Sequence, residues 1–234
     1  MTAILIFLVG IAGIIVWWMA RQRLASKPWL EVGVIGDVPE MQGSSATIAK
    51  VGLGIFLAVV GALFTLLISA YLGRMGGADW WSIPIPGLLW VNTAALAASS
   101  LALQWAKTEA GTDHRERLNA ALAAGFVTAV LFVSGQFLAW RQLLSAGYVL
   151  ANNPSNSFFY MITGLHGLHV LGGLFVLGRT AFRARSEPLS ARISLSVELC
   201  AIYWHFMLVV WLILFALFAG WANSFVDLCR QLVT

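Results

Sequence analysis

Charged residues are scarce in this 234-residue sequence: they make up 10% of the chain, hydrophobic residues make up 60%, and the mean hydropathy is +0.84. Soluble domains carry about 25% charged residues, so the composition excludes an ordinary soluble domain and predicts a membrane protein. Cysteine is rare too, with only Cys200 and Cys229. Neither has a partner at a metal-binding spacing, so we expect no disulfide framework and interpret both as small apolar residues.

The sequence also lacks the patterns that mark a catalytic centre. It has no recognisable nucleophile–base pair, phosphate-binding loop or carboxylate dyad. It has no convincing internal repeat, so a transporter built from inverted repeats gains no support. We therefore expect this chain to carry no catalytic centre of its own.

Six apolar stretches are present, each long enough to cross a membrane as a helix, which takes about 20 residues. They are residues 2–20, 48–73, 86–106, 118–138, 156–178 and 194–221. They do not alternate between polar and apolar residues, which argues against β-barrel strands. In the first stretch the basic residues follow the apolar run, so it predicts a retained helix rather than a signal peptide. The expected fold is an all-α bundle of about six transmembrane helices.

Lysine and arginine residues are distributed unequally between the loops. Eleven of the 14 fall on one side, which the positive-inside rule assigns to the cytoplasm. These are Arg21, Arg23, Lys27, Lys50, Lys107, Arg115, Arg117, Arg179, Arg183, Arg185 and Arg192, against Arg74, Arg141 and Arg230 on the other side. Both termini are then extracytoplasmic. This topology accounts for the net charge of +4, so we expect no nucleic-acid partner.

Four ionisable residues lie inside the predicted spans, where such residues are candidates for function. They are His166 and His169 in the fifth span and Glu198 and His205 in the sixth. The two histidines are one helical turn apart and share a face, as do Glu198 and His205, two turns apart. The residues alone leave three alternatives: metal ligands, a proton relay or lipid-headgroup site, and hydrogen bonds between helices.

The residues around the histidines help to choose among these three alternatives. No acidic or sulfur ligand accompanies them at a ligand spacing, which argues against a metal site. The segment TGLHGLHVLGG contains Gly164, Gly167, Gly172 and Gly173, and small residues let neighbouring membrane helices approach closely. This pattern favours hydrogen bonds between helices.

Several motifs, taken together, resemble subunit III of the haem–copper oxidases. They are FFYMITGLHGLHVLGGL at 158–174, YWHFMLVVWL at 203–212 with Glu198 seven residues before its histidine, the NT and SS pairs of the third span, SGQFLAW at 134–140 and KVGLGIFLAVVGALF at 50–64. The resemblance covers residues 48–221. It implies a five-helix subunit III domain at 48–234, preceded at 1–47 by an extra transmembrane helix and a cytoplasmic loop.

The resemblance implies a non-catalytic subunit of a respiratory terminal oxidase in a bacterial inner (plasma) membrane. Such subunits have two helix groups around a cleft that holds phospholipid, and they stabilise subunit I during turnover. Haem and copper are then expected in the partner subunits and no cofactor or metal in this chain. The expected partners are subunit I directly, subunit II, small subunits and membrane phospholipids.

For the site, the resemblance implies a polar cluster between the last helices, near lipid headgroups. Its members would be His166, His169, Glu198, His205 and Trp204. Two family acids are absent, because Val60 and Leu208 stand where many members have a glutamate and an aspartate. The family's proton-uptake role for that glutamate cannot be transferred to Val60.

The alternatives are a subunit III-like protein of a quinol oxidase or nitric oxide reductase complex and, in another class, a free-standing proton channel or transporter. A proton relay needs ionisable groups through the membrane depth. Here the middle of the second span has none, and Glu198 is the only acid within the spans. This argues against the channel or transporter. Among the oxidases, the resemblance favours a cytochrome c oxidase, because cytochrome c oxidases are the more common setting of these motifs.

Overall fold

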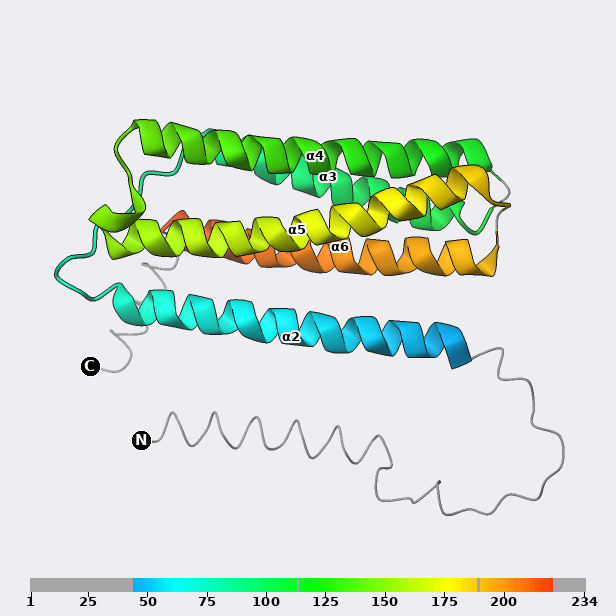
Figure 1. The fold of residues 1–234 in the computed structure, drawn as a ribbon, viewed down its shortest axis with the longest axis horizontal. Coiled ribbons are helices and arrows are strands. Elements are labelled where there is room, and N and C mark those ends of the chain that lie inside the picture. Colours follow the sequence, from blue (N-terminus) through cyan, green and yellow to red (C-terminus); the bar gives the residue numbers. More distant parts are fainter. Residues whose placement is uncertain (1–43, 113, 189, 221–234) are drawn as a thin grey trace, which may run out of the picture. The chain divides into compact units, whose positions relative to one another are not determined.

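The computed structural model describes residues 44–112, 114–188 and 190–220. This part of the chain contains five α-helices, one short 3₁₀ helix and no strand, which confirms the all-helical prediction. The helices are α2 (Ser44–Arg74), α3 (Leu88–Glu109), α4 (Arg115–Ser145), α5 (Pro154–Ser186) and α6 (Ala191–Phe218), with η2 (Leu150–Asn152) before α5 (Figure 1). The predicted first span at 2–20, Cys229 and Arg230 lie outside the described residues.

The last four helices form a closed ring, in which α3 packs on α4, α4 on α5, α5 on α6, and α6 back on α3. Helix α2 packs on α5 and α6 and makes no contact with α3 or α4. Figure 1 shows it running along the outside of the ring. Helix α2 is therefore the least enclosed of the five, with 11% of its most apolar window buried against 33–50% for the windows in α4, α5 and α6.

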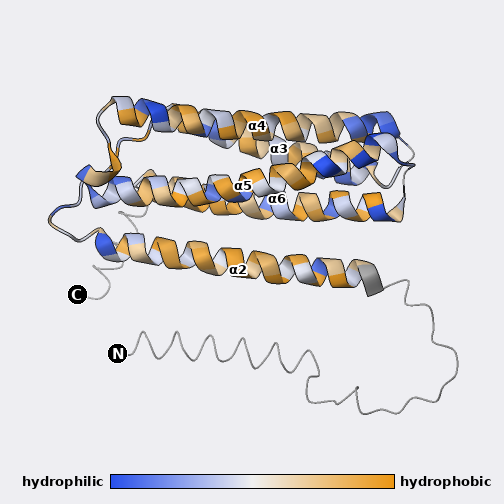
Figure 2. Cartoon of the chain, viewed as in Figure 1, coloured by the Kyte–Doolittle hydropathy of each residue, from blue (hydrophilic) through white to orange (hydrophobic). Residues whose placement is uncertain are grey.

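Four of the described helices, α2, α4, α5 and α6, are long and apolar enough to cross a membrane. The predicted span at 86–106 is helical as α3, but it does not meet the same apolar criterion. The reason is the polar side chains in its sequence, LLWVNTAALAASSLALQWAKTE. In Figure 2, by contrast, hydrophobic residues predominate along α2. Asn92, Ser99 and Ser100 are all buried, so α3 turns these groups toward its neighbours.

Most of the described helices extend past the predicted apolar stretches into polar sequence. Helix α4 covers Arg115–Ser145 against a predicted 118–138, and α5 covers Pro154–Ser186 against 156–178. Continuing the helix satisfies backbone groups where the chain leaves an apolar environment. The N-terminus of α5 is capped by Asn153, whose Oδ1 accepts from Ser155 N at 3.0 Å, with Pro154 in the first turn.

Polar contacts between helices supplement the apolar core. Ser99 Oγ on α3 donates to Gly125 O on α4 at 2.7 Å, and Trp140 Nε1 on α4 donates to Thr163 Oγ1 on α5 at 3.1 Å. Such contacts matter in an apolar medium, because the hydrophobic effect gives membrane helices little reason to associate. They fix the ring α3–α6 that positions the ionisable residues.

Candidate functional site

His166 on α5 is completely buried. Its Nε2 donates to Met207 O on α6 at 3.2 Å, which leaves Nδ1 as the acceptor of a neutral ring. That Nδ1 is buried and has no hydrogen-bond partner among the described residues. The rings of Phe64, Phe132 and Trp211 surround the imidazole, with centroids 6.2, 5.7 and 5.1 Å away. His166 thus joins three neighbouring helices in a largely apolar setting.

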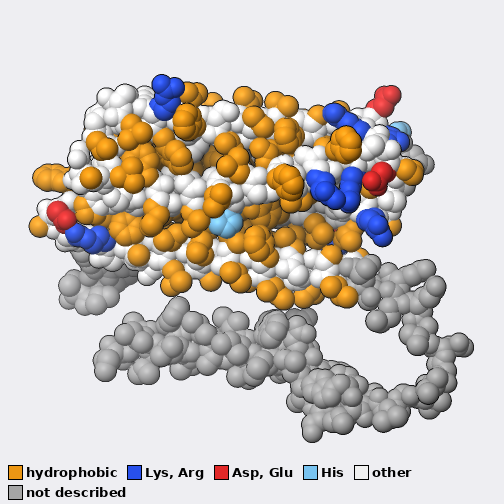
Figure 3. Space-filling model, viewed as in Figure 1, with side chains coloured by type: hydrophobic (Ala, Val, Ile, Leu, Met, Phe, Trp, Pro, Cys, Tyr) orange, Lys and Arg blue, Asp and Glu red, His pale blue; other side chains and the backbone are white. Residues whose placement is uncertain are grey.

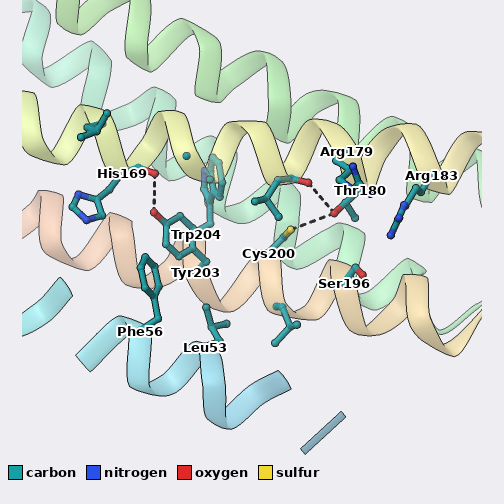
Figure 4. A pocket seen from close by; sticks show the side chains of 15 residues that line it. Leu53, Phe56, His169, Arg179, Thr180, Arg183, Ser196, Cys200, Tyr203 and Trp204 are labelled. Atoms are coloured by element: carbon teal, nitrogen blue, oxygen red, sulfur yellow. Dashed lines mark hydrogen bonds between the residues drawn. The ribbon is translucent and has the colours of Figure 1, made fainter. Parts of the chain in front are cut away.

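His169 is one turn further along α5 and only partly buried. Its Nδ1 donates to Leu165 O in its own helix at 2.8 Å. Its Nε2 makes no hydrogen bond with any described residue, and the side chain lies at the edge of a groove (Figure 4). The neighbouring Tyr203 on α6 donates its hydroxyl to His169 O at 2.7 Å and ties the two helices together.

His205 on α6 faces α3 and not α5. Its Nε2 donates to Gln104 Oε1 at 3.0 Å, and its Nδ1 is hydrogen bonded to Ser100 Oγ. The amide oxygen accepts from Nε2–H, and in a neutral ring Nδ1 then accepts from the serine hydroxyl. His205 therefore belongs to the seam between α3 and α6.

Glu198 lies two turns into α6, beside Lys50 and Lys107. Figure 3 shows basic side chains gathered at one end of the bundle. Glu198 Oε2 is 2.8 Å from Lys50 Nζ on α2, and Glu198 Oε1 is 3.6 Å from Lys107 Nζ on α3. The carboxylate is 27% exposed. It connects the two helices that flank α6 and have no direct contact with each other.

The structure thus separates the four ionisable residues of the predicted cluster. His166 and His169 contact Phe64 in common, His205 pairs with α3, and Glu198 pairs with two lysines. Trp204, the fifth member, is buried beside the groove, and its indole N–H has no partner among the described residues. Sequence spacing alone could not tell which helix each of these side chains meets.

The glycines near the histidines are only partly explained by close packing. A Cβ on Gly173 would lie 2.7 Å from Trp204 Cζ3, and one on Gly164 would lie 3.5 Å from Trp140. At Gly167 and Gly172 a Cβ would meet no described residue within 4 Å. Close packing therefore requires glycine at Gly173, whereas at Gly164 the contact is an ordinary van der Waals one, and at Gly167 and Gly172 the described residues leave the prediction untested.

The positions of the two missing family acids are apolar and packed. Val60 is buried, and Leu208 packs partly buried against the hydrophobic core. Phe64, one turn after Val60, fills the space beside both His166 and His169. Neither imidazole has a charged partner on α2.

A groove of about 640 Å³ opens between α2, α5 and α6. Apolar side chains and glycines line most of it, including Leu53 and Phe56 of α2, Gly172 of α5 and Leu199 of α6. Toward the basic end of the bundle it is lined by Arg179 and Arg183, and Figure 4 shows both at the same end of the groove. The groove therefore combines an apolar channel with guanidinium groups at one end.

The arginines of the groove were counted in the sequence for topology alone. A further signal was present, because His169, Gly172, Val176, Arg179 and Arg183 follow one another at spacings of three and four. Such spacings put all five on one helical face. What the sequence could not show is that this face opens toward α2.

Metal-ligating side chains do not converge in the described part of the chain: no three of His, Cys, Asp and Glu lie close enough together there to hold an ion. His166 and His169 lie one turn apart on α5. Their ring nitrogens donate to carbonyls of different helices, Met207 O on α6 and Leu165 O on α5.

Comparison with known proteins places the chain among oxidase subunits. The family described as "Cytochrome c oxidase subunit III" matches residues 50–223. A protein of Synechocystis sp. named "Cytochrome c oxidase subunit 3" is 33% identical over 179 residues, covering 71% of this chain and 72% of that protein. Proteins of the same name from Paracentrotus lividus (32% identical) and Triticum aestivum (31%) align with 57% and 64% of this chain, and with 50% and 53% of their own lengths.

The chain thus spans about half the length of the last two relatives. The family match includes both histidine motifs, the groove face of α5 and the whole of α3 to α6. The match over most of the chain, together with the apolar helices, assigns the chain to this family. The chain belongs to the cytochrome c oxidase subunit III family, a family of membrane-embedded oxidase subunits.

Proposed function

We propose that this chain is the non-catalytic subunit III of a respiratory cytochrome c oxidase, where it binds phospholipid and stabilises the haem-bearing subunit I. Haem, copper and oxygen reduction with its coupled proton translocation would belong to the partner subunits. The relatives' names support an oxidase with cytochrome c as the electron donor. Subunit II and small subunits would complete the complex.

The groove between α2, α5 and α6 supports the proposed binding of phospholipid. Its apolar walls suit acyl chains, and Arg179 and Arg183 at one end suit a phosphate. Guanidinium groups bind phosphate through paired hydrogen bonds, and they attract anionic headgroups at the cytoplasmic leaflet. Arg183 is also 4.0 Å from Glu187, a weak contact that a phosphate could displace.

For the membrane arrangement we propose six spans with both termini extracytoplasmic, in a bacterial plasma membrane. The described helices supply five of these spans, with α3 crossing because its polar groups are bonded inside the bundle. The basic end of the bundle, with Lys50, Lys107 and Arg115, would face the cytoplasm. The sixth span would be the apolar stretch at 2–20.

The test is purification of the chain from its native membrane in a mild detergent, with haem spectra, subunit identification and phospholipid analysis. We expect the chain to purify with haem-bearing subunits and with bound phospholipid. A chain that purifies without any haem-containing companion would overturn the assignment.

The groove is tested separately with the double variant Arg179→Leu, Arg183→Leu. We expect at least a twofold loss of bound phospholipid with haem content unchanged. The matched control is Arg117→Leu, which removes an exposed cytoplasmic-end arginine that does not line the groove. Equal lipid retention in the double variant and the control would show that the groove is not the lipid site.

A further inference from the structure

The two halves of α2 differ in how they are packed. From residue 46 to residue 59 no side chain is buried, whereas Val60, Phe64 and Tyr71 all belong to the hydrophobic core. Near the end of the helix, Tyr71 also packs edge-on against three aromatic rings. The half of α2 from Val60 onward is therefore anchored in the bundle, and the half before it is not held by core packing.

The half of α2 without buried side chains covers the groove between α5 and α6. Leu53 and Phe56 line the groove from this side, and Figure 4 shows both pointing from α2 toward α6. The ring of Phe56 stacks on that of Tyr203 with the centroids 6.3 Å apart, although Phe56 remains exposed. We call residues 46–59 the lid, because they form one wall of the groove without being fixed in the core.

An ion pair joins the lid to α6. Lys50 Nζ is 2.8 Å from Glu198 Oε2, and the two side chains are 46% and 27% exposed. Ion pairs this open to solvent are weak and are screened by salt. Glu198 also approaches Lys107 of α3 at 3.6 Å, so the carboxylate keeps a cationic neighbour when Lys50 moves away. The contact between the lid and α6 can therefore open easily.

The boundary between the lid and the anchored half has residues that let a helix bend. Gly61 directly follows Val60, and Thr65 Oγ1 donates to Gly61 O at 2.8 Å. A hydroxyl that bonds back to the carbonyl one turn earlier often bends a helix, and glycine is conformationally permissive. A Cβ at Gly61 would make an ordinary contact with the Phe206 ring at 3.6 Å, so close packing does not account for this glycine. The position suits a hinge.

We propose that the lid swings about Gly61 to open the groove sideways to the membrane, and that the ion pair between Lys50 and Glu198 is the latch that keeps it closed. A phospholipid enters or leaves the groove while the lid is open. The inference rests on the proposed binding of phospholipid in the groove, and it adds how that site opens and closes. The lid moves at its latched end because the aromatic contacts of Tyr71 fix the other end of α2.

Distances between spin labels in the intact membrane complex test the movement. In a cysteine-free background, one pair of labels is placed at Ile48 on the lid and at Phe182 on α5, which are 67% and 72% exposed. The control pair is at Leu66, in the anchored half of α2, and at Met161 on α5, both exposed. We expect Glu198→Gln to lengthen and broaden the first distance distribution and to leave the second unchanged.

Lipid exchange tests what the movement does. The purified complex is incubated with phosphatidylglycerol that carries deuterated chains, and replacement of the bound lipid is followed by native mass spectrometry. We expect exchange to be about twofold to fivefold faster in Glu198→Gln and in Lys50→Gln, the range of one exposed ion pair. The matched control is Lys107→Gln, which removes the other neighbour of the carboxylate and leaves the latch in place.

A reversible crosslink tests the latch in the opposite direction. Cysteines replace Lys50 and Glu198 in the cysteine-free background, and a short bismethanethiosulfonate then joins the lid to α6 at the two positions of the ion pair. We expect lipid exchange to slow when the crosslink forms and to recover when a reductant cleaves it. Exchange at the same rate before and after cleavage would show that lipid does not pass the lid.

The outcomes separate the lid from the proposed function. An Ile48–Phe182 distance that neither Glu198→Gln nor Lys50→Gln changes overturns the movement. Exchange in both variants at the rate of Lys107→Gln overturns the role of the latch in lipid entry, even where the distance lengthens. Equal lipid retention in Arg179→Leu, Arg183→Leu and in the wild type overturns lipid binding in the groove, whereas the spin-label distances still decide whether the lid moves.

Discussion

His166 and His169 are three residues apart on α5 and have different surroundings. His166 is completely buried among Phe64, Phe132 and Trp211, whereas His169 is partly open to the groove. The imidazole of His166 links α5 to α6 through Met207 O, whereas the imidazole of His169 bonds only to Leu165 O of its own helix. A sequence motif that looks symmetrical therefore contains one structural and one groove-facing residue.

This difference predicts unequal effects of alanine substitution. His166→Ala should lower the free energy of unfolding by about 2–5 kcal/mol, because it leaves a cavity in a packed core and removes an interhelical hydrogen bond. His169→Ala should cost less, because its side chain is partly exposed. Thermal unfolding of both variants in the same detergent measures the difference, and equal losses would contradict the burial of His166.

Gly172 and Gly173 offer a second matched pair on α5. A Cβ on Gly173 would come within 2.7 Å of Trp204, whereas one on Gly172 would meet nothing within 4 Å. We expect Gly173→Ala to destabilise by about 1–3 kcal/mol through overpacking. Gly172→Ala should be neutral or slightly stabilising, because alanine favours helix. The unfolding midpoints of both variants in the same detergent test this prediction. A Gly173→Ala variant as stable as the wild type would show that α5 and α6 can move apart to accept the methyl group.

At the level of elements, α5 depends on the loop that precedes it. Asn153 caps the helix through Ser155 N, and its Nδ2 also donates to Trp81 O at 2.6 Å, which connects the α4–α5 and α2–α3 loops. Asn153→Ala should lower the free energy of unfolding by about 0.5–2 kcal/mol, the usual range for a lost N-cap. The comparison is Asn152→Ala, which loses only an exposed contact to Gly147 O at 3.3 Å. Similar unfolding midpoints for the two variants would argue against the cap.

The end of α2 is joined to its following loop by Arg74 and Asp79. Arg74 Nη2 is 2.6 and 2.8 Å from the carboxylate oxygens, and this hydrogen bond holds the pKa of Asp79 below its usual value. A lowered folded-state pKa means that the contact is intact at neutral pH and is lost as pH falls through that pKa. Carboxyl ¹³C shifts should show the low value in wild type and a higher one in Arg74→Gln. An Asp79 pKa unchanged by that substitution would contradict the contact.

The helices themselves were largely predictable from the sequence, because long apolar runs in a membrane leave the backbone no alternative to internal hydrogen bonding. The ends of the helices were less predictable. Helix α4 begins at Arg115 and α5 ends at Ser186, both in charged sequence where hydropathy gives no signal. Arg115 donates to Ala184 O, Arg185 O and Glu187 O, so a side chain of one helix completes the end of another. Such a long-range cap has no local sequence pattern.

For the whole molecule, the charge asymmetry predicts which loops a membrane-impermeant thiol reagent can reach. In a Cys200→Ala, Cys229→Ala background, a cysteine introduced at Gly76 or Ala151 should be labelled from outside intact cells. One introduced at Thr112 should be labelled only after the membrane is opened. These positions lie in the loops on opposite sides of the described helices. Labelling of Thr112→Cys from outside would reverse the proposed orientation.

The sequence predicts which residues belong to the candidate site, but it predicts only part of their arrangement. His166, His169, Glu198 and His205 stand out because ionisable groups are rare within apolar spans. Their partners do not, since Ser100, Gln104 and Lys107 are ordinary residues until α3 is brought beside α6. A proposed cluster between the last two helices is in fact spread over contacts with α2, α3, α5 and α6.

The class of this protein can be inferred from its sequence: the membrane composition, the helices, the family and the ionisable residues within the spans. Those features depend on local hydropathy, charge and short motifs, which need no knowledge of neighbours. The arrangement of the helices had to come from the folded structure. It shows that α3 to α6 close into a ring with α2 outside it, that Glu198 pairs with two lysines, and that His169 and two arginines share a groove. Apolar helices can pack in many ways at similar free energy, so the choice among them depends on specific side-chain contacts between distant segments.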